Sequence, residues 1–335
     1  MTAKKIDIIN IGLIIISLII AVIMPFELFL FSYAVLGPLH YLTEINWLHE
    51  KKYFISTKKK WSIVFIVITL LIAVEPIVRL PGLEISASIE KIITTISRYN
   101  KVYLLTAFLF AVCLIFLNGF RNLTIALLGV IIVAFVSVYY VPTVFVFMGV
   151  FLPTLVHVYI FTWFFILYGA IKAKSKYGYY LAVLLLTVPF IITFIPIHYP
   201  IYKPSSGTLE AFASSSIESV SRVVSRILNG FQEDNFQVLS EIGIRIQIFI
   251  AFAYTYHYLN WFSKTSIIGW RKAMTKRNAF IILLIWIAAI GLYLYDFRTG
   301  LIALFLLSFL HVLLEFPLNV ITIREVLFRK RKRVS

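Results

Sequence analysis

The chain has 335 residues, of which 61% are hydrophobic, and its mean hydropathy is +0.94. Continuous apolar runs long enough to cross a bilayer recur from end to end, which excludes a soluble globular protein and, because the runs do not alternate, a transmembrane β-barrel. The net charge of +16 arises from basic residues in short loops and in the run 329–333, as the positive-inside rule predicts. We therefore expect these charges to lie near anionic lipid head groups, and we do not expect the protein to bind nucleic acid. We predict an all-α, polytopic transmembrane helical bundle that forms a single integral-membrane domain, residues 1–335.

About ten apolar runs are expected to cross the membrane, separated by turns that contain proline, glycine or basic residues. In chain order they cover residues 9–24, 27–48, 61–78, 102–117, 123–140, 144–171, 179–196, 242–262, 279–295 and 301–323. The loops between them that are rich in lysine and arginine should be cytoplasmic, which places both termini in the cytoplasm as well. The longest polar stretch, 198–240, then lies on the extracytoplasmic side.

Two stretches outside the spans have the pattern of amphipathic helices that lie in the membrane interface. The apolar positions of the first are Ile85, Ile89, Ile92, Ile93 and Ile96, with charged residues between them. The second lies within the extracytoplasmic loop 198–240, and its apolar positions are Ile217, Val220, Val224 and Ile227.

Four histidines fall inside predicted spans, although ionisable groups at membrane depth are costly and usually functional. They are His40, His157, His257 and His311. In the ten-span topology all four lie on helices that run from outside to inside, three near mid-depth and His257 closer to the cytoplasm. A single intramembrane histidine is often a packing residue, but four on helices of the same direction favour convergence on one site.

A glutamate follows two of these histidines at helical spacing. Glu44 comes four residues after His40, and Glu315 comes four residues after His311, so each helix face presents an imidazole and a carboxylate together. Two arrangements remain open. The histidines could hold one metal ion while the glutamates accept the second ring N–H groups, or all six groups could hold two iron ions directly.

Neutral imidazole is a common ligand of iron, copper and zinc, and an iron site with open positions in an apolar bundle suits dioxygen chemistry on a lipid-soluble substrate. Aromatic residues, 16% of the chain, would line the path of such a substrate. Those that flank the histidines are Tyr41, Phe161, Tyr256, Tyr258 and Trp261. Asn260 and Asn319 share helix faces with His257 and His311 and are candidate hydrogen-bond donors to the site.

The remaining ionisable residues near the spans are expected to lie outside the site. His49 adjoins a charged loop and His198 falls at the outer interface, so neither is predicted to bind metal. Glu75 lies one helical turn before Arg79, and we predict that they form a structural ion pair.

The segment 37–44, GPLHYLTE, together with histidines dispersed over several spans, resembles the Brp/Blh family of bacterial membrane β-carotene 15,15'-dioxygenases. The resemblance implies an iron-dependent enzyme of the bacterial inner membrane that acts on a carotenoid or another isoprenoid. It also implies that the four intramembrane histidines are iron ligands. The chain departs from the family pattern at Tyr41, where the family has glycine, at Glu44, where it has aspartate, and at Ile45, where it has a second histidine.

Two other functions use the same residues. Histidines paired across helices could be the axial ligands of haem in an electron-transfer protein. Histidines and glutamates could instead relay protons in a proton-coupled transporter, although the sequence has no inverted repeat of the kind transporters use. In the oxygenase, Glu44 and Glu315 are the candidate catalytic residues.

Overall fold

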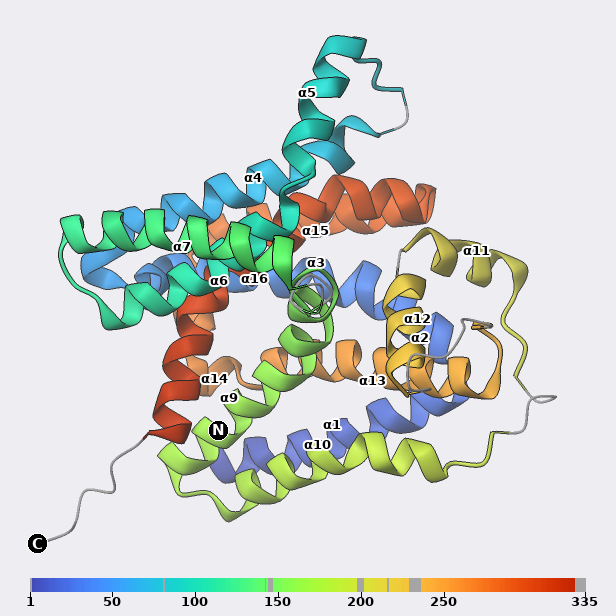
Figure 1. Cartoon of the computed structure of the whole chain (residues 1–335). Helices are drawn as coiled ribbons and strands as arrows, with labels where there is room; N and C mark the ends of the chain where they lie inside the picture. The colour runs from blue at the N-terminus through green and yellow to red at the C-terminus, as the bar shows by residue number, and fades with distance from the viewer. Residues whose placement is uncertain are drawn as a thin grey trace, which may run out of the picture. The chain divides into compact units, whose positions relative to one another are not determined.

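The computed structural model describes residues 2–80, 82–141, 143, 147–197, 202–215, 217–228 and 236–328, and within these ranges it contains helices and no β-strand. The prediction of an all-α bundle is therefore confirmed. In chain order the helices, labelled in Figure 1, are α1 (Ala3–Ile23), α2 (Pro25–Phe31), η1 (Ser32–Leu36), α3 (Gly37–Glu50), η2 (Lys52–Phe54), η3 (Ser56–Trp61), α4 (Ser62–Val78), α5 (Ala87–Ser97), α6 (Asn100–Phe116), α7 (Phe120–Tyr140), η4 (Phe147–Phe161), α9 (Thr162–Ala173), α10 (Lys176–Phe194), α11 (Ser206–Ser214), α12 (Ile217–Leu228), α13 (Glu241–Ser263), α14 (Thr265–Ile268), η5 (Trp270–Ala273), α15 (Lys276–Tyr295) and α16 (Phe297–Leu327).

Eight helices of the described chain are long and apolar enough to cross a membrane, and the bent pair α5 and α6 would make a ninth. The eight correspond to predicted spans, and α6 accounts for the predicted span 102–117. They are Ala3–Ile23, Pro25–Glu50, Ser56–Val78, Phe120–Tyr140, Phe151–Ala173, Lys176–Phe194, Lys276–Tyr295 and Phe297–Leu327. The protein is therefore an integral membrane protein.

The tenth predicted span, 242–262, is α13, which does not belong to the strongly apolar set. Its 23 residues make it long enough to cross, but it carries Gln247, Thr255 and Asn260, all buried. A helix enclosed by other helices can keep such side chains, because they meet protein and not lipid. This enclosure explains why a hydropathy criterion passes over α13.

The described helices form two compact units, and the boundary falls within α3 and within η4. Unit 1 comprises Met1–His40 and Val158–Leu301, and unit 2 comprises Tyr41–His157 and Ile302–Ser335. Each unit has its own buried core.

In unit 1, α13 packs against α1, α2 and α10, and α1 runs beside α10 (Figure 1). Polar contacts tie these apolar helices together at defined points. Asn10 of α1 donates to Oγ of Ser263 at 2.9 Å, and the hydroxyl of Ser32 lies 2.7 Å from that of Thr255. Such contacts fix the register of helices whose apolar faces alone would slide.

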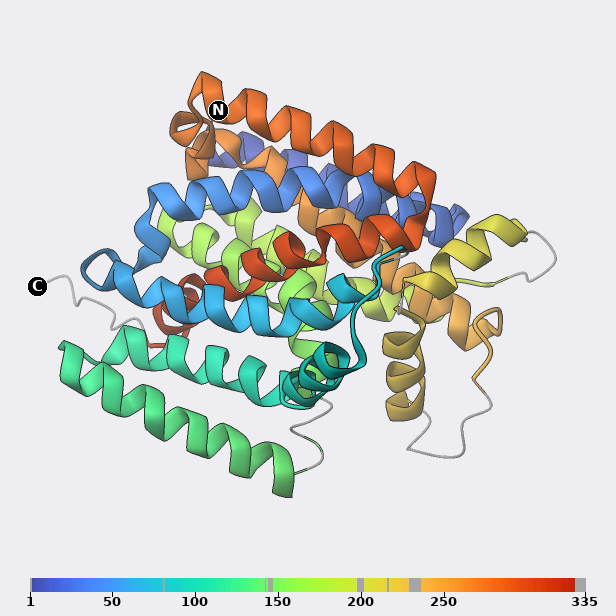
Figure 2. The same ribbon diagram turned by 90° about the horizontal axis from the view of Figure 1, so that it is seen from above.

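In unit 2, α6 and α7 form a hairpin and lie side by side (Figure 2). Gly119 makes the turn with a φ of +87°, which favours glycine. Lys58 of η3 closes the end of α6, because its Nζ donates to the carbonyls of Leu114 at 2.6 Å and Leu117 at 2.5 Å. The predicted pair of Glu75 and Arg79 is present on α4, with 2.6 Å between Oε1 and Nη2.

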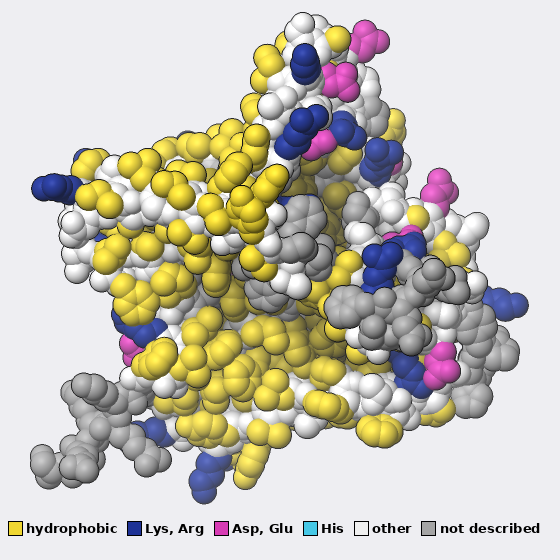
Figure 3. Space-filling view, viewed as in Figure 1, with side chains coloured by type: hydrophobic (Ala, Val, Ile, Leu, Met, Phe, Trp, Pro, Cys, Tyr) yellow, Lys and Arg dark blue, Asp and Glu magenta, His cyan; other side chains and the backbone are white. Residues whose placement is uncertain are grey.

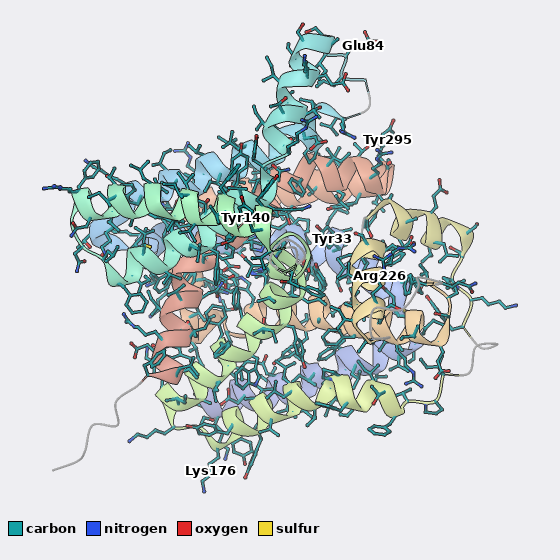
Figure 4. All side chains as sticks on the ribbon, in the orientation of Figure 1. Tyr33, Glu84, Tyr140, Lys176, Arg226 and Tyr295 are labelled. Carbon is teal, nitrogen blue, oxygen red and sulfur yellow. The ribbon has the colours of Figure 1, made fainter. Side chains whose placement is uncertain are left out.

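Hydrophobic side chains cover much of the face drawn in Figure 3, including the surfaces of α7 and α10. This is the surface that lipid is expected to contact. Tyr140 and Tyr295, labelled in Figure 4, are exposed at the ends of α7 and α15, while Lys176 projects from the start of α10. Exposed aromatic and basic residues at helix ends are typical of the membrane–water boundary.

Both predicted amphipathic helices are present, as α5 and α12. On α5, Ile89 and Ile92 are exposed and only Ile93 is buried, as expected for a helix that leaves apolar side chains for lipid. On α12 the buried face contains Ile217 and Val220, as predicted, but it continues through two serines while Ile227 is exposed. The buried side of α12 packs against α11 and α13.

Candidate metal centre

One of the four intramembrane histidines follows a π-helical segment within one turn, and another lies inside one. In unit 1, η1 ends directly before α3, and the Gly37 N–H bonds to the Ser32 carbonyl five residues earlier. Pro38, which has no N–H to continue an α-helical ladder, follows at once. In unit 2, η4 contains Pro153 four residues before His157. Such wide turns are rare and are frequent at functional sites, because they rotate the side chains that follow them.

In unit 1, His40 and His257 point their ring nitrogens at one another. Their Nε2 atoms are 3.1 Å apart, the ring planes meet at 73°, and both side chains are buried. The hydroxyl oxygen of Thr162 lies 2.7 Å from Nδ1 of His257. If Nδ1 donates to this hydroxyl, Nε2 of His257 is the unprotonated nitrogen, and it faces Nε2 of His40.

In unit 2, His157 and His311 make the same arrangement. Their Nε2 atoms are 3.2 Å apart, the ring planes meet at 72°, and both rings are buried. Nδ1 of His157 lies 3.1 Å from Oε2 of Glu315, although this oxygen sits off the direction of a straight ring hydrogen bond. The ring of Tyr41 stacks on that of His311 at 5.7 Å.

The two glutamates of the predicted site are both buried in unit 2. Glu44 is 1% exposed and Glu315 is 3% exposed. They are close enough for their negative charges to repel one another. A cation or a proton bound between them would relieve this repulsion.

The nitrogen separations fit the spacing of two ligands on one ion. Two nitrogens bound at about 2.0–2.1 Å, with bond angles of roughly 90–110°, lie about 2.8–3.4 Å apart. An N–H···N hydrogen bond between neutral rings has a similar length, so the spacing alone fits both. In unit 2 a carboxylate lies beside the pair, and imidazoles with a carboxylate are a donor set suited to iron, zinc or manganese. In unit 1 the oxygen beside the pair is the hydroxyl of Thr162.

The structure thus brings the predicted histidines together two by two, one pair in each unit. That all four share one point stays a prediction. Thr162 was not among the predicted site residues, because a threonine in an apolar run carries no signal until the fold places it on His257. Of the predicted aromatic neighbours, Tyr258 and Trp261 contact His40, whereas Tyr256 points its hydroxyl at Asn10.

The other polar residues near the spans lie as follows. His49 is exposed and its ring contacts Tyr53, which agrees with its predicted place at the interface. His198 falls outside the described residues. Asn260 and Asn319 are buried, and their role as donors to the site stays a prediction.

Comparison of the chain with protein-family models, with curated proteins and with solved structures finds no match. The resemblance to the Brp/Blh family accordingly stays a prediction from segment 37–44. Function must be argued from the site itself.

Proposed function

We propose that the protein is a membrane-embedded, metal-dependent oxygenase that uses iron and acts on a lipid-soluble substrate. The observation that carries the proposal is the facing of Nε2 atoms at 3.1 Å and 3.2 Å in two buried histidine pairs. In each pair one ring also has an oxygen at its Nδ1 atom, from Thr162 in unit 1 and from Glu315 in unit 2. Metal-binding histidines usually have such a partner, which fixes the tautomer and the ring orientation.

The residues of the site divide the work between binding and proton transfer. The Nε2 atoms of the paired histidines would hold the metal, and a bound iron ion would supply the activation of dioxygen. Glu315 and Thr162 orient two of the rings. Glu44 and Glu315 are both buried in unit 2 and are the proposed carriers of protons to or from the reacting groups.

The spacing within each pair favours a bare metal ion over haem. The two axial ligands of a haem iron lie on opposite sides of it and are about 4 Å apart, at roughly 2 Å from the iron on each side. The separations of 3.1 Å and 3.2 Å leave no room for a porphyrin between the rings of one pair.

The proposed substrate class follows from the setting of the site. Both pairs are buried in an integral membrane protein, so a substrate that dissolves in the bilayer has the shortest way in. A carotenoid or another isoprenoid is the substrate that the resemblance of segment 37–44 implies. We further propose that the membrane is the bacterial inner membrane, with both termini in the cytoplasm. Reporter fusions after Lys60, Lys176 and Lys276 should then read cytoplasmic, and fusions near Ser206 should read external.

Metal analysis of the detergent-purified protein, with an absorption spectrum of the same sample, tests the function. We expect about one iron ion per chain if the four histidines share it, and two if each pair binds its own. His311→Ala and His257→Ala should each lower the iron content, while His49→Ala should leave it unchanged. Wild-type protein that carries no stoichiometric transition metal, or that shows a Soret band, would contradict the proposal.

A further inference from the structure

We propose that one end of unit 2 binds an anionic phospholipid, whose phosphate lies among Lys59, Lys60 and Arg121 and whose acyl chain lies along α7. We call these three basic residues, together with the rings of Trp61 and Phe120, the lipid patch. The patch belongs wholly to unit 2. It contains no residue of the candidate metal centre, so the proposal does not depend on a bound metal ion.

Contacts between η3 and the α6–α7 hairpin bring the lipid patch together. The ring of Trp61, at the end of η3, lies 5.3 Å from the ring of Phe120, with planes at 30°. Nζ of Lys58 donates to two carbonyls at the end of α6, which fixes η3 against the hairpin. Lys60 directly precedes Trp61 and Arg121 directly follows Phe120, so the two basic residues flank this ring contact.

The lipid patch lies where two candidate membrane spans begin. The spans are Ser56–Val78 and Phe120–Tyr140, and the residues of the patch come from the first two turns of each. Tryptophan and basic residues are enriched at the depth of the lipid head groups. We therefore expect the patch at that depth, in the leaflet that the positive-inside rule predicts to be cytoplasmic and whose lipids are partly anionic.

The three basic side chains of the patch have no acidic partner. All three are exposed, and within the part of the chain that the structure describes none of them forms an ion pair. Segments 56–74 and 91–209, which include the patch, contain no aspartate or glutamate. A phospholipid phosphate carries the missing negative charge, and the planar guanidinium of Arg121 can donate two parallel hydrogen bonds to it.

An apolar stripe on α7 continues from Arg121. Ile125, Leu128 and Ile132 follow it at helical spacing on one face, and each is more than half exposed. The face is open because α7 packs mainly against α6, and hydrophobic side chains cover it (Figures 2 and 3). The stripe is about 16 Å long, roughly half of the hydrocarbon core of a bilayer, which is the depth that one acyl chain reaches.

The two rings give the patch a shape that scattered surface lysines lack. Phe120 is 77% exposed although it contacts Trp61, so its free side is open to a ligand. Nε1 of Trp61 makes no hydrogen bond within the described residues and can donate to an ester or phosphate oxygen. Charge, ring wall and apolar stripe thus follow one another in the order of a phospholipid's head group, ester region and acyl chain.

Quenching of indole fluorescence by brominated lipid tests the patch, because bromine quenches an indole only at short range. The full chain is reconstituted in phosphatidylcholine vesicles that contain a small fraction of brominated phosphatidylglycerol or, in a second sample, the same fraction of brominated phosphatidylcholine. The signal of Trp61 is the wild-type fluorescence minus that of Trp61→Phe. We expect phosphatidylglycerol to quench Trp61 several-fold more than phosphatidylcholine does, and excess inorganic phosphate should not displace it.

Lys60→Gln combined with Arg121→Gln should make the two lipids quench Trp61 equally, while Arg121→Lys should keep part of the preference because it keeps the charge. Lys276→Gln combined with Arg277→Gln is the matched control. These two residues are also exposed at the start of a candidate span but belong to unit 1, so the preference should persist without them.

Three results would overturn the proposal. Equal quenching by the two lipids in the wild type would show that the patch does not select an anionic lipid. Absence of quenching by either lipid would show that protein, such as a second copy of the chain, covers the patch. Displacement by inorganic phosphate would show that the patch binds a free anion and not a lipid.

Discussion

Nδ1 of His157 lies 3.1 Å from Oε2 of Glu315, and neither side chain is more than 4% exposed. A carboxylate placed beside an imidazole away from water acts on that ring more strongly than it would at a surface. It favours the tautomer whose Nε2 is free, and Nε2 is the atom that faces His311. The orientation of the unit 2 pair therefore depends on Glu315.

Glu315→Gln should weaken metal binding by about 10–100-fold, because the amide lacks the charge that holds the ring in its binding tautomer. Competition with a chelator of known affinity measures this loss. Glu325→Gln on the same helix is the control, since Glu325 is partly exposed and pairs with Arg324 at 3.2 Å. Equal affinity in Glu315→Gln and the wild type would show that the carboxylate does not orient the ring.

Thr162→Val should weaken metal binding at the unit 1 pair by about tenfold, since valine keeps the shape of threonine and loses the oxygen at Nδ1 of His257. Thr162→Ser should restore most of the affinity. Thr193→Val is the matched control, because the hydroxyl of Thr193 bonds only to the Phe190 carbonyl of its own helix. Iron titration of the three variants, read by absorption, separates these outcomes.

Gly178→Ala should destabilise the protein by about 1–3 kcal/mol, the usual cost of overpacking. A Cβ at this position would lie 2.7 Å from the Cβ of Ala170 and 3.0 Å from its Cα, where α10 meets α9. Gly291→Ala on α15 meets nothing within 4 Å and should be neutral or stabilising by up to about 1 kcal/mol. Thermal unfolding in detergent should rank them in this order, and a Gly178→Ala variant as stable as Gly291→Ala would contradict the packing described for α9 and α10.

Lys264 should make stability depend on pH above neutrality. Burial lowers the pKa of its amine from 10.5 to about 8, and the negative charge of Asp7 opposes part of this shift. At a pH between these two pKa values the unfolded chain binds more protons than the folded one. The free energy of unfolding therefore rises as the pH increases through this window. Unfolding temperatures measured across it should rise less in Lys264→Met than in the wild type, whereas Asp7→Asn should lower the pKa of Lys264 further.

Much of the fold could be predicted from the sequence because membrane helices must be apolar and must begin and end at recognisable residues. Pro25 separates α1 from α2 as its lack of an N–H requires, and the Glu75–Arg79 pair follows from helical spacing. The two serines on the buried side of α12 could not be predicted from its apolar periodicity, because the packing against α11 and α13 selects that side.

The candidate site was predictable in its members and not in its grouping. Histidines at membrane depth stand out in any sequence, and the spacing of Glu315 from His311 places both on one face of α16. That spacing predicts that His311 and Glu315 face the same neighbour, and both lie against His157, whose identity as that neighbour the spacing does not predict. Contacts between helices depend on their rotation and tilt, and a single sequence contains no direct signal for either.

The enclosure of α13 has a consequence for how the chain is made. A helix that carries His257, Asn260 and Gln247 partitions poorly into lipid, because each polar residue makes the free energy of membrane insertion less favourable. The helices that surround it in unit 1, α1, α2 and α10, all emerge from the ribosome before it. These helices can already be inserted in the bilayer when α13 is made, so that α13 packs against protein and not against lipid. The order of synthesis therefore allows α13, which carries one of the site histidines, to enter the membrane after α1, α2 and α10.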